Sequence, residues 1–422
     1  MEPSLPRPAG RFATRAVLGA TTVPDVEQRP VSPAIWPSTT WATVASAQVG
    51  ELLTDQRHGY VYGRYDNPTA TTLHGVVASL HGAPAAWSFA SGTAAIHATL
   101  DALRGDGRVL AASRLYGGTW ALLDRLRRDA GWGVDLAEVR HADDLVAAVD
   151  DRHTVVHVET VANPAMTVTD LAGLAVACRE RGLALVVDNT FASPYLCRPY
   201  ELGATAAVES ATKYLGGHGD VVAGVIAGDD GLIGRVRTHA YELGASLSPF
   251  DAWLVSRGIQ TLPLRVREAC RNAQAVAEAL VADPRGLPVR YPGLADHPEH
   301  ALAAAQFDGR GFGALLAFDL PDRAAAEAFA DACRVFARAS SLGGTHSLVL
   351  HPASTSHRQL DDAALAAAGL GPGTVRLSAG IESAEDLVAD VAQALDAAYE
   401  VWSGIRRSRV AHDDPPPSAP KD

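Results

Sequence analysis

The sequence predicts an α/β fold with a mainly parallel sheet, followed by a second, smaller α/β domain. Two observations support this. Between residues 85 and 228, short β-rich runs alternate with alanine- and leucine-rich helical stretches, which is typical of parallel strands joined by helical crossovers. After residue 247 the pattern changes to a long amphipathic helix and then a mixed region. In such folds functional loops gather at the carboxyl ends of the strands.

The strands of the first domain are expected at RVLAASRL, TVVHVET, LALVVDNT, AAVESAT and VVAGVIAG. The stretch 250–280 reads as a long helix broken near Pro263, because proline lacks the backbone N–H of a helix interior. Strands of the second domain are expected at GALLAFDL and TVRLSAG. We therefore place an N-terminal arm at 1–60, the first domain at 61–250, the second at 251–406 and a disordered, proline-rich tail at 407–422.

Composition narrows the class of protein. Of 422 residues, 47% are hydrophobic, and the formal net charge is −12, so no basic field is available to attract nucleic acid or an anionic membrane. The N-terminus has no apolar run near the ~20 residues of a membrane span, which argues against secretion and membrane insertion. The four cysteines lie far apart without a CxxC pair, which favours neither disulfides nor a zinc site. A cytoplasmic location is expected.

One stretch, VESATKYLGGHGD at 208–220, places Lys213 shortly after a predicted strand and before three glycines, Gly216, Gly217 and Gly219. A lysine there can be a solvated strand end. The glycines do not belong to a GxxxxGK[ST] phosphate loop, a GxSxG nucleophile elbow or a GxGxxG dinucleotide motif, all of which are missing from the sequence. The three glycines therefore need another explanation.

Two further pieces point to one chemistry. SGTAAIHATLDAL predicts a helix whose first N–H groups, at Gly92 and Thr93, form an anion site. Asp188 closes the apolar strand in VVDNTF, where it either caps the next loop or faces a positively charged ring nitrogen. Together with Lys213 these residues predict a site for pyridoxal 5'-phosphate: an amine for a Schiff base, an acid that keeps the pyridine nitrogen protonated, and a helix start for the phosphate.

The same residues carry a family resemblance. SATKYLGGHGD, VDNTF, YGRYDNPT, SGTAAI, LYGGT, VANP, SLGG, HPASTSH and VRLSAGIE resemble motifs of the cystathionine γ-synthase, cystathionine γ-lyase and methionine γ-lyase family, the pyridoxal phosphate-dependent enzymes of cysteine and methionine metabolism. The resemblance covers about residues 60 to 400. It implies a fold-type I pyridoxal phosphate-dependent transferase with an N-terminal arm, a cofactor domain and a C-terminal domain.

The resemblance also implies roles. Lys213 would be the Schiff-base lysine and a proton carrier, Asp188 the partner of the pyridine nitrogen, and Tyr116 the ring that stacks on the cofactor and exchanges a proton with the leaving group. Asn163 would hold the ring hydroxyl and lie at the substrate. The phosphate would be bound by four residues of the same chain, Gly92, Thr93, Ser210 and Thr212. From the residues alone, Tyr116 can be mere packing and Asn163, before a proline, a turn former.

Arg376 stands mid-strand among apolar neighbours, so its guanidinium needs a carboxylate. A structural salt bridge is one possibility; the resemblance makes the partner the α-carboxylate of an amino-acid substrate, held also by Ser341. Tyr62 and Arg64 would reach the phosphate of a neighbouring subunit, which implies a homo-oligomer, a dimer of dimers; alternatively their loop stacks on its own chain.

The residues at two positions give conflicting indications of the substrate. Cystathionine-handling members of the family have an acid where this chain has His346, and methionine γ-lyases have a cysteine where it has Gly118. The expected activity is γ-elimination or γ-replacement on a sulfur amino acid or homoserine ester. A homoserine-ester sulfhydrylase, a cystathionine β-lyase and a non-catalytic cofactor-binding protein remain alternatives. His346, His351 and His357 match no metal-ligand spacing, so no metal is expected.

Overall fold

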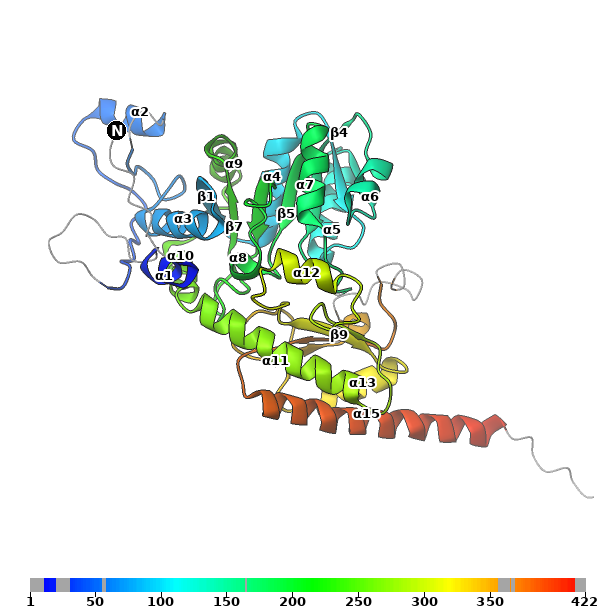
Figure 1. Ribbon diagram of the computed structural model, residues 1–422. Helices are drawn as coiled ribbons and strands as arrows, with labels where there is room; N and C mark the ends of the chain where they lie inside the picture. The colour runs from blue at the N-terminus through cyan, green and yellow to red at the C-terminus, as the bar shows by residue number, and fades with distance from the viewer. Residues whose placement is uncertain are drawn as a thin grey trace, which may run out of the picture.

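The computed structural model describes residues 11–19, 31–54, 58–163, 165–355, 365 and 369–413, with the backbone alone for 18–19 and 405–413. Two sheets organise these residues, one of seven strands and one of five. Figure 1 shows the larger sheet with its helices above and the smaller sheet below it, bordered by two long helices. The predicted α/β fold with a second, smaller α/β unit is confirmed.

The larger sheet is mainly parallel. Its order is β1-β7-β6-β5-β4-β2-β3; β7 runs antiparallel to both β1 and β6, while the pairs from β6 to β3 are parallel. All five strand runs expected for this domain are present. The strands are β1 (Ala85–Phe89), β2 (Arg108–Ala112), β3 (Val134–Ala137), β4 (His153–Glu159), β5 (Ala184–Asp188), β6 (Ala206–Glu209) and β7 (Gly224–Gly228).

Both faces of this sheet are buried, because successive side chains of a strand point to opposite faces. Val186 joins the core under α4 and α9, whereas its neighbours Leu185 and Val187 join the core on the other face, with α3 and α7. The covering helices are α3 (Pro68–His81), α4 (Gly92–Arg104), α5 (Gly117–Asp129), α6 (Ala142–Ala148), α7 (Leu171–Glu180), α8 (Ser193–Leu196) and α9 (Asp230–Leu243).

The smaller sheet has the order β10-β11-β12-β9-β8, and only the β10–β11 pair is parallel. The expected strands at GALLAFDL and TVRLSAG are β9 and β12. Its strands are β8 (Val289–Arg290), β9 (Leu315–Asp319), β10 (Ala337–Arg338), β11 (Leu348–Leu350) and β12 (Thr374–Ser378). Around them lie α12 (His300–Gln306), α13 (Arg323–Ala332), the 3₁₀ turn η1 (Pro352–Ser354) and α15 (Ala384–Asp413).

The predicted break near Pro263 is confirmed: α10 (Pro249–Ile259) ends before α11 (Leu262–Ala282), whose first turn contains the proline. Helix α10 packs on α3, so it lies with the larger sheet. Helix α11 spans both halves, since Val266 and Ala269 belong to the core of the larger sheet and Val276 and Leu280 to that of the smaller one. The sequence-based boundary at 250–251 falls inside α10.

The chain ends are partly described. In the predicted arm, α1 (Phe12–Gly19) packs on α3 and α11, and α2 (Ser46–Leu53) lies apart from the sheets (Figure 1). At the other end α15 continues through 407–413, which the sequence assigns to the tail; residues 414–422 lie outside the described part.

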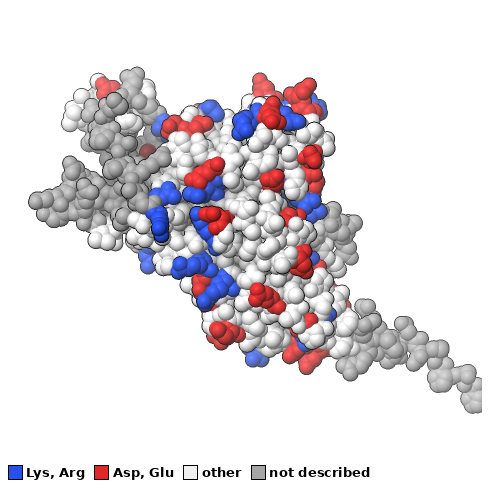
Figure 2. Space-filling view, viewed as in Figure 1, with Lys and Arg blue, Asp and Glu red and all other residues white. Residues whose placement is uncertain are grey.

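The surface charges and the buried cysteines are of the kind that globular proteins commonly have. Cationic and anionic side chains are interspersed over the face shown in Figure 2. Among the helices that could be searched, none is both long and apolar enough to cross a membrane. The four cysteines are free and buried, and burial raises the pKa of Cys178, Cys270 and Cys333 to about 12.

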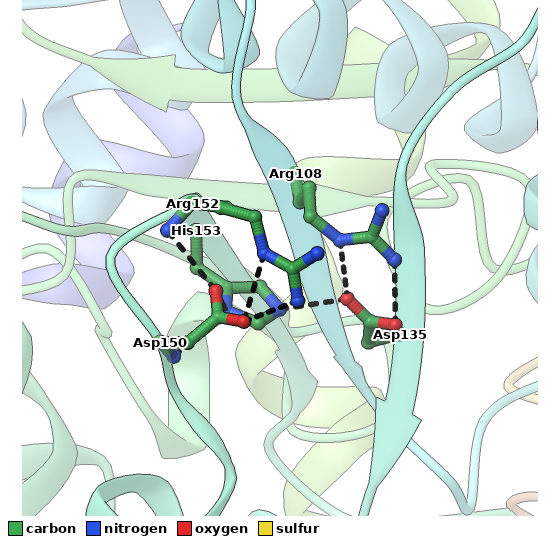
Figure 3. Close-up of polar contacts among 5 residues, drawn as sticks. All are labelled: Arg108, Asp135, Asp150, Arg152 and His153. Carbon is green, nitrogen blue, oxygen red and sulfur yellow. Dashed lines mark hydrogen bonds and ion pairs between the residues drawn. The ribbon is translucent and has the colours of Figure 1, made fainter.

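An ion-pair network ties together the amino ends of three strands, β2, β3 and β4 (Figure 3). Arg108 of β2 donates from Nε and Nη2 to Asp135 of β3, at 2.6 and 2.7 Å. His153 of β4 lies between Asp135, at 3.0 Å, and Asp150, at 2.9 Å. The Arg108 guanidinium holds the pKa of Asp135 below its usual range. The network joins neighbouring strands far from the loops that follow their carboxyl ends.

Candidate active site

Two acids close neighbouring parallel strands. Glu159 ends β4 and Asp188 ends β5, directly opposite each other in the register. Asp188 Oδ1 accepts hydrogen bonds from the N–H and the hydroxyl of Thr190, at 3.0 and 2.5 Å. Burial raises the pKa of Asp188 to about 6. The described contacts involve Oδ1, which leaves Oδ2 for a cationic partner.

The start of α4 faces Ser210, the residue that follows β6. Ser91 caps the helix by accepting the N–H of Ala94 at 3.2 Å. The first backbone bond of the helix is donated by Ala95, so the N–H groups of Gly92 and Thr93 have no acceptor inside the helix. A Cβ added to Gly92 would lie 2.9 Å from Cβ of Ser210. Glycine is therefore required for this close approach, and the helix start and a hydroxyl share one small cradle.

The predicted fourth phosphate ligand, Thr212, is already engaged. Its hydroxyl donates to the carbonyl of Ala223 at 3.2 Å and accepts the Ala223 N–H at 3.0 Å. To donate to a phosphate, this hydroxyl would have to turn away from the Ala223 carbonyl. Ser210, by contrast, is bound through its backbone N–H to Thr190 Oγ1, at 2.8 Å. Thr190 thus links Ser210 to Asp188.

Lys213 lies in the turn after β6. Its Nζ donates to Ser341 Oγ at 2.8 Å, across the boundary between the two sheets. Burial, and then the charge of Arg376, lowers the pKa of Lys213 to about 8. Beneath the glycine-rich turn, Gly217 has φ +74°, and an added Cβ would overlap Nη1 of Arg265. A side chain at Gly217 would therefore displace a buried guanidinium as well as strain the backbone.

Arg376, at 6% exposure, stands in the middle of β12. Nη1 donates to Asn163 Oδ1 at 3.2 Å and Nη2 to the carbonyl of Ser341 at 2.8 Å, while Nε has no hydrogen-bond partner. Burial lowers the pKa of Arg376 to about 10. No carboxylate of the described residues pairs with this guanidinium, so the guanidinium can bind the carboxylate of a ligand.

Ser341 holds an uncommon backbone conformation. Its φ is +83°, a region that non-glycine residues rarely occupy. The residue offers its hydroxyl to Lys213 and its carbonyl to Arg376. Strained residues of this kind persist where surrounding contacts hold them, and they cluster at active sites.

Tyr116 is the N-cap residue of α5, and its side chain is 51% exposed. Its backbone N–H donates to Glu159 Oε1 at 2.6 Å. A Cβ added to Gly118 would overlap Cε1 of Tyr116. Glycine at position 118 therefore gives the tyrosine ring the space that a larger residue would occupy.

Tyr62 and Arg64 contact other residues of their own chain. Arg64 donates from Nη1 to the carbonyl of Tyr241 and lies over the ring of Tyr65, with 4.9 Å from Cζ to the centroid. Tyr62 forms a single bridge with Thr40, and its side chain is 41% exposed. These described partners include none of the residues predicted to bind the phosphate.

A cavity of about 620 Å³ opens beside Thr212 and Ser341. Its walls come from the turn after Lys213, from α10 and from the segment before β11. Polar groups on these walls belong to His218, Asp220, Asp251, Ser340 and His346. Of the three histidines that sequence spacing excluded as a metal site, His357 lies outside the described residues; no metal-binding cluster occurs among the residues that are described.

Two residues of the site were missed by sequence reasoning. Glu159 contacts the backbone of Tyr116 and Asn163, and Thr190 joins Asp188 to Ser210. The signal for Glu159 was present in TVVHVET, where an acid closes a buried strand as Asp188 does in LALVVDNT. Thr190 had no signal beyond its place two residues after Asp188.

The arrangement fits pyridoxal phosphate on structural grounds. A partly buried amine of lowered pKa, a buried carboxylate with one oxygen left over, and a helix start cradled against a serine lie on adjacent strand ends. The unpaired Arg376 adds a place for a carboxylate beside the amine.

Comparison with known proteins supports this reading. The family model described as Cys/Met metabolism PLP-dependent enzyme matches residues 13–396. The chain is 41% identical to L-methionine gamma-lyase of Pseudomonas putida, over 92% of this chain and 97% of that protein. It is 38% identical to cystathionine beta-lyase of Lactococcus lactis subsp. cremoris, over 80% and 88% respectively.

Among solved structures, cystathionine gamma synthase from Xanthomonas oryzae pv. oryzae, in complex with cystathionine, superposes with a TM-score of 0.86. Sequence identity is 37%, covering 93% of this chain and all of that one. The predicted fold-type I architecture and the predicted cofactor are thereby confirmed. The chain belongs to the pyridoxal phosphate-dependent enzymes of cysteine and methionine metabolism, lyases and synthases that act on sulfur amino acids.

Proposed function

We propose that this enzyme catalyses γ-elimination or γ-replacement on a sulfur amino acid or homoserine ester. The observation that carries the proposal is the pairing of Lys213 with Arg376: a partly buried amine stands beside a buried guanidinium that has no carboxylate of its own among the described residues. An α-amino acid brings a carboxylate for the second group and an α-proton for the first.

When bound, the cofactor withdraws the electron pair left behind as a proton leaves the substrate. Asp188 supports this by holding a positive charge on the pyridine nitrogen through its free oxygen. Lys213 attaches the cofactor and then moves the proton at the substrate Cα. Its lowered pKa, about 8, keeps part of the amine neutral near pH 7, so it can accept that proton.

Arg376 orients the substrate. Its Nη1 and Nη2 donate to Asn163 and Ser341, and these two hydrogen bonds fix the plane of the guanidinium. Nε has no such partner, so it can bind the α-carboxylate together with one of the Nη groups. The substrate's Cα is then presented toward Lys213 Nζ. Tyr116 lies within electrostatic range of Arg376 and would exchange a proton with the leaving group.

The phosphate would be held by the N–H groups of Gly92 and Thr93, by Ser210 and, after its hydroxyl rotates, by Thr212. Tyr62 and Arg64 of a neighbouring subunit would complete the site, as the family resemblance implies; in their own chain, neither has a described contact with Gly92, Thr93, Ser210 or Thr212. The smallest active unit would then be a dimer, paired again into a homotetramer. The cytoplasmic location expected from the sequence is part of the same proposal.

The choice of substrate side chain and leaving group depends on the cavity beside Ser341. Its volume of about 620 Å³ admits a long thioether side chain as well as a short ester. His346 on its wall replaces the acid expected of a cystathionine-binding enzyme, which favours a substrate without a distal ammonium group. Gly118 leaves the room that the Tyr116 ring occupies, so this position would influence how the ring meets the leaving group.

The proposal is tested with a panel of methionine, cystathionine, cysteine, homocysteine and an O-acylhomoserine, the last alone, with a thiol and with sulfide. Products are separated as ketoacids, thiols and thioethers. Four-carbon 2-oxobutanoate or a thioether product would support γ-chemistry. Pyruvate as the main product would replace the proposal with the β-lyase alternative, and activity on the ester only with sulfide would indicate the sulfhydrylase.

A further inference from the structure

Glu159 is a buried acid whose partners are backbone groups. Its side chain is 6% exposed at the carboxyl end of β4. Oε1 accepts the N–H of Tyr116 at 2.6 Å, and Oε2 lies 3.4 Å from the N–H of Asn163. No cation of the described chain forms an ion pair with it.

Burying the carboxyl group of Glu159 costs free energy. Burial, and then the charge of neighbouring Asp188, raises the pKa of Glu159 to about 8. An apolar residue of similar volume would avoid burying this polar group, whose ionised form is in addition repelled by Asp188. Stability of the fold therefore does not explain an acid at this position. The two residues whose N–H groups it accepts offer a better explanation.

The two donors belong to the residues that contact the substrate and leaving group in the function proposed above. Tyr116 begins α5 after β2, and Asn163 lies in the loop after β4. The Asn163 side chain in turn contacts Nη1 of Arg376. One carboxylate thus spans two separate loops, and a shift of either loop would move the phenol or the guanidinium relative to Lys213.

We propose that Glu159 is a positioning residue: by accepting the N–H groups of Tyr116 and Asn163 together, it fixes the phenol and the amide relative to each other across the cofactor site. This inference rests on the roles proposed for Tyr116 and Asn163. It assigns Glu159 no contact with the substrate.

The test compares Glu159→Gln and Glu159→Ala with Val156→Ala, a cavity variant of a fully buried residue on the same strand. Holoenzyme of each is measured by visible circular dichroism of the cofactor, by thermal unfolding, and by kcat and KM. A glutamine side chain has one acceptor oxygen, so Glu159→Gln should keep the shorter bond to Tyr116 and lose that to Asn163.

We expect Glu159→Gln to raise KM with kcat within about threefold of wild type, and Glu159→Ala to lower kcat by about 10- to 100-fold. The visible dichroism should change in Glu159→Ala and stay unchanged in Val156→Ala. Unchanged dichroism and kinetics in Glu159→Ala, or the same changes in Val156→Ala at equal loss of stability, would overturn the proposal. If the wild type turns over no substrate of the panel, the proposed function fails while the dichroism still tests Glu159.

Discussion

Lys213 Nζ donates to Ser341 Oγ at 2.8 Å, and the same serine holds a left-handed backbone with φ +83°. The contact joins the turn after β6 to the segment before β11, so each half of the molecule supplies one partner. Ser341 also accepts from Arg376 through its carbonyl. The strained residue therefore places both the amine and the guanidinium.

Ser341→Gly and Ser341→Ala separate strain from hydroxyl chemistry. Both variants lose the hydroxyl, but only glycine adopts a positive φ freely, so Ser341→Gly should be more stable than Ser341→Ala by about 1 kcal/mol. Chemical denaturation of the two holoenzymes measures this difference. Equal stabilities would show that the backbone at this position carries no strain.

Lys213 should control the pH dependence of cofactor capture. The neutral amine is the reactive form, and burial lowers its pKa to about 8. The rate at which apo-protein binds pyridoxal phosphate should therefore rise about tenfold per pH unit below pH 8 and level off above it. Stopped-flow visible absorbance follows this rate. A rate that still rises steeply up to pH 10 would contradict the lowered pKa.

The chain offers a clean control for that experiment, because its only lysines are Lys213 and Lys421. Borohydride reduction of the holoenzyme and peptide mapping should find the cofactor on Lys213. Lys421→Arg should leave the pH profile unchanged, and Lys213→Ala should abolish covalent attachment. Label that persists in Lys213→Ala would reassign the attachment site.

Arg376→Lys and Arg376→Gln should weaken substrate binding more than cofactor binding. Lysine keeps the charge but cannot present two donors in one plane, so KM should rise about 10-fold in Arg376→Lys and about 100-fold in Arg376→Gln. Steady-state kinetics and visible absorbance measure the two properties. Arg290→Gln, which breaks an ion pair with Asp319 in the same sheet, is the matched control and should leave KM unchanged.

Arg64 should act in the site of a neighbouring subunit. Lys213→Ala and Arg64→Ala proteins are each expected to have little activity, but mixed dimers contain one site with both residues intact. Under random subunit exchange the mixture should regain about a quarter of wild-type activity. The Lys213→Ala protein mixed with the double variant is the control without restoration. If exchange is demonstrated and activity stays absent, Arg64 acts within its own chain.

Sequence predicted seven strands (β2, β4, β5, β6, β7, β9 and β12) and the helix break, because each depends on local pattern, and it placed the candidate site residues through motifs. Asp188 and Lys213 stand at strand ends, where parallel topology brings side chains together. The residues next to Ser341 and Thr212 in the sequence do not predict the positive φ of Ser341 or the hydrogen bonds of the Thr212 hydroxyl with Ala223. Both features result from contacts between different segments of the chain. Glu159 was missed for another reason: its partners are backbone N–H groups, which almost every residue carries.

Helix α11 has one end in each core, and Arg265 on it donates to the carbonyls of Tyr214 and Gly258 beneath the turn that carries Lys213. A hinge between the two halves would have to bend this continuous helix or pull a buried guanidinium from its acceptors. This helix therefore opposes a clamshell closure of the two halves. Adaptation to different substrates would then fall to the short segments around the cavity, of which Ser341 is the one that also positions the lysine.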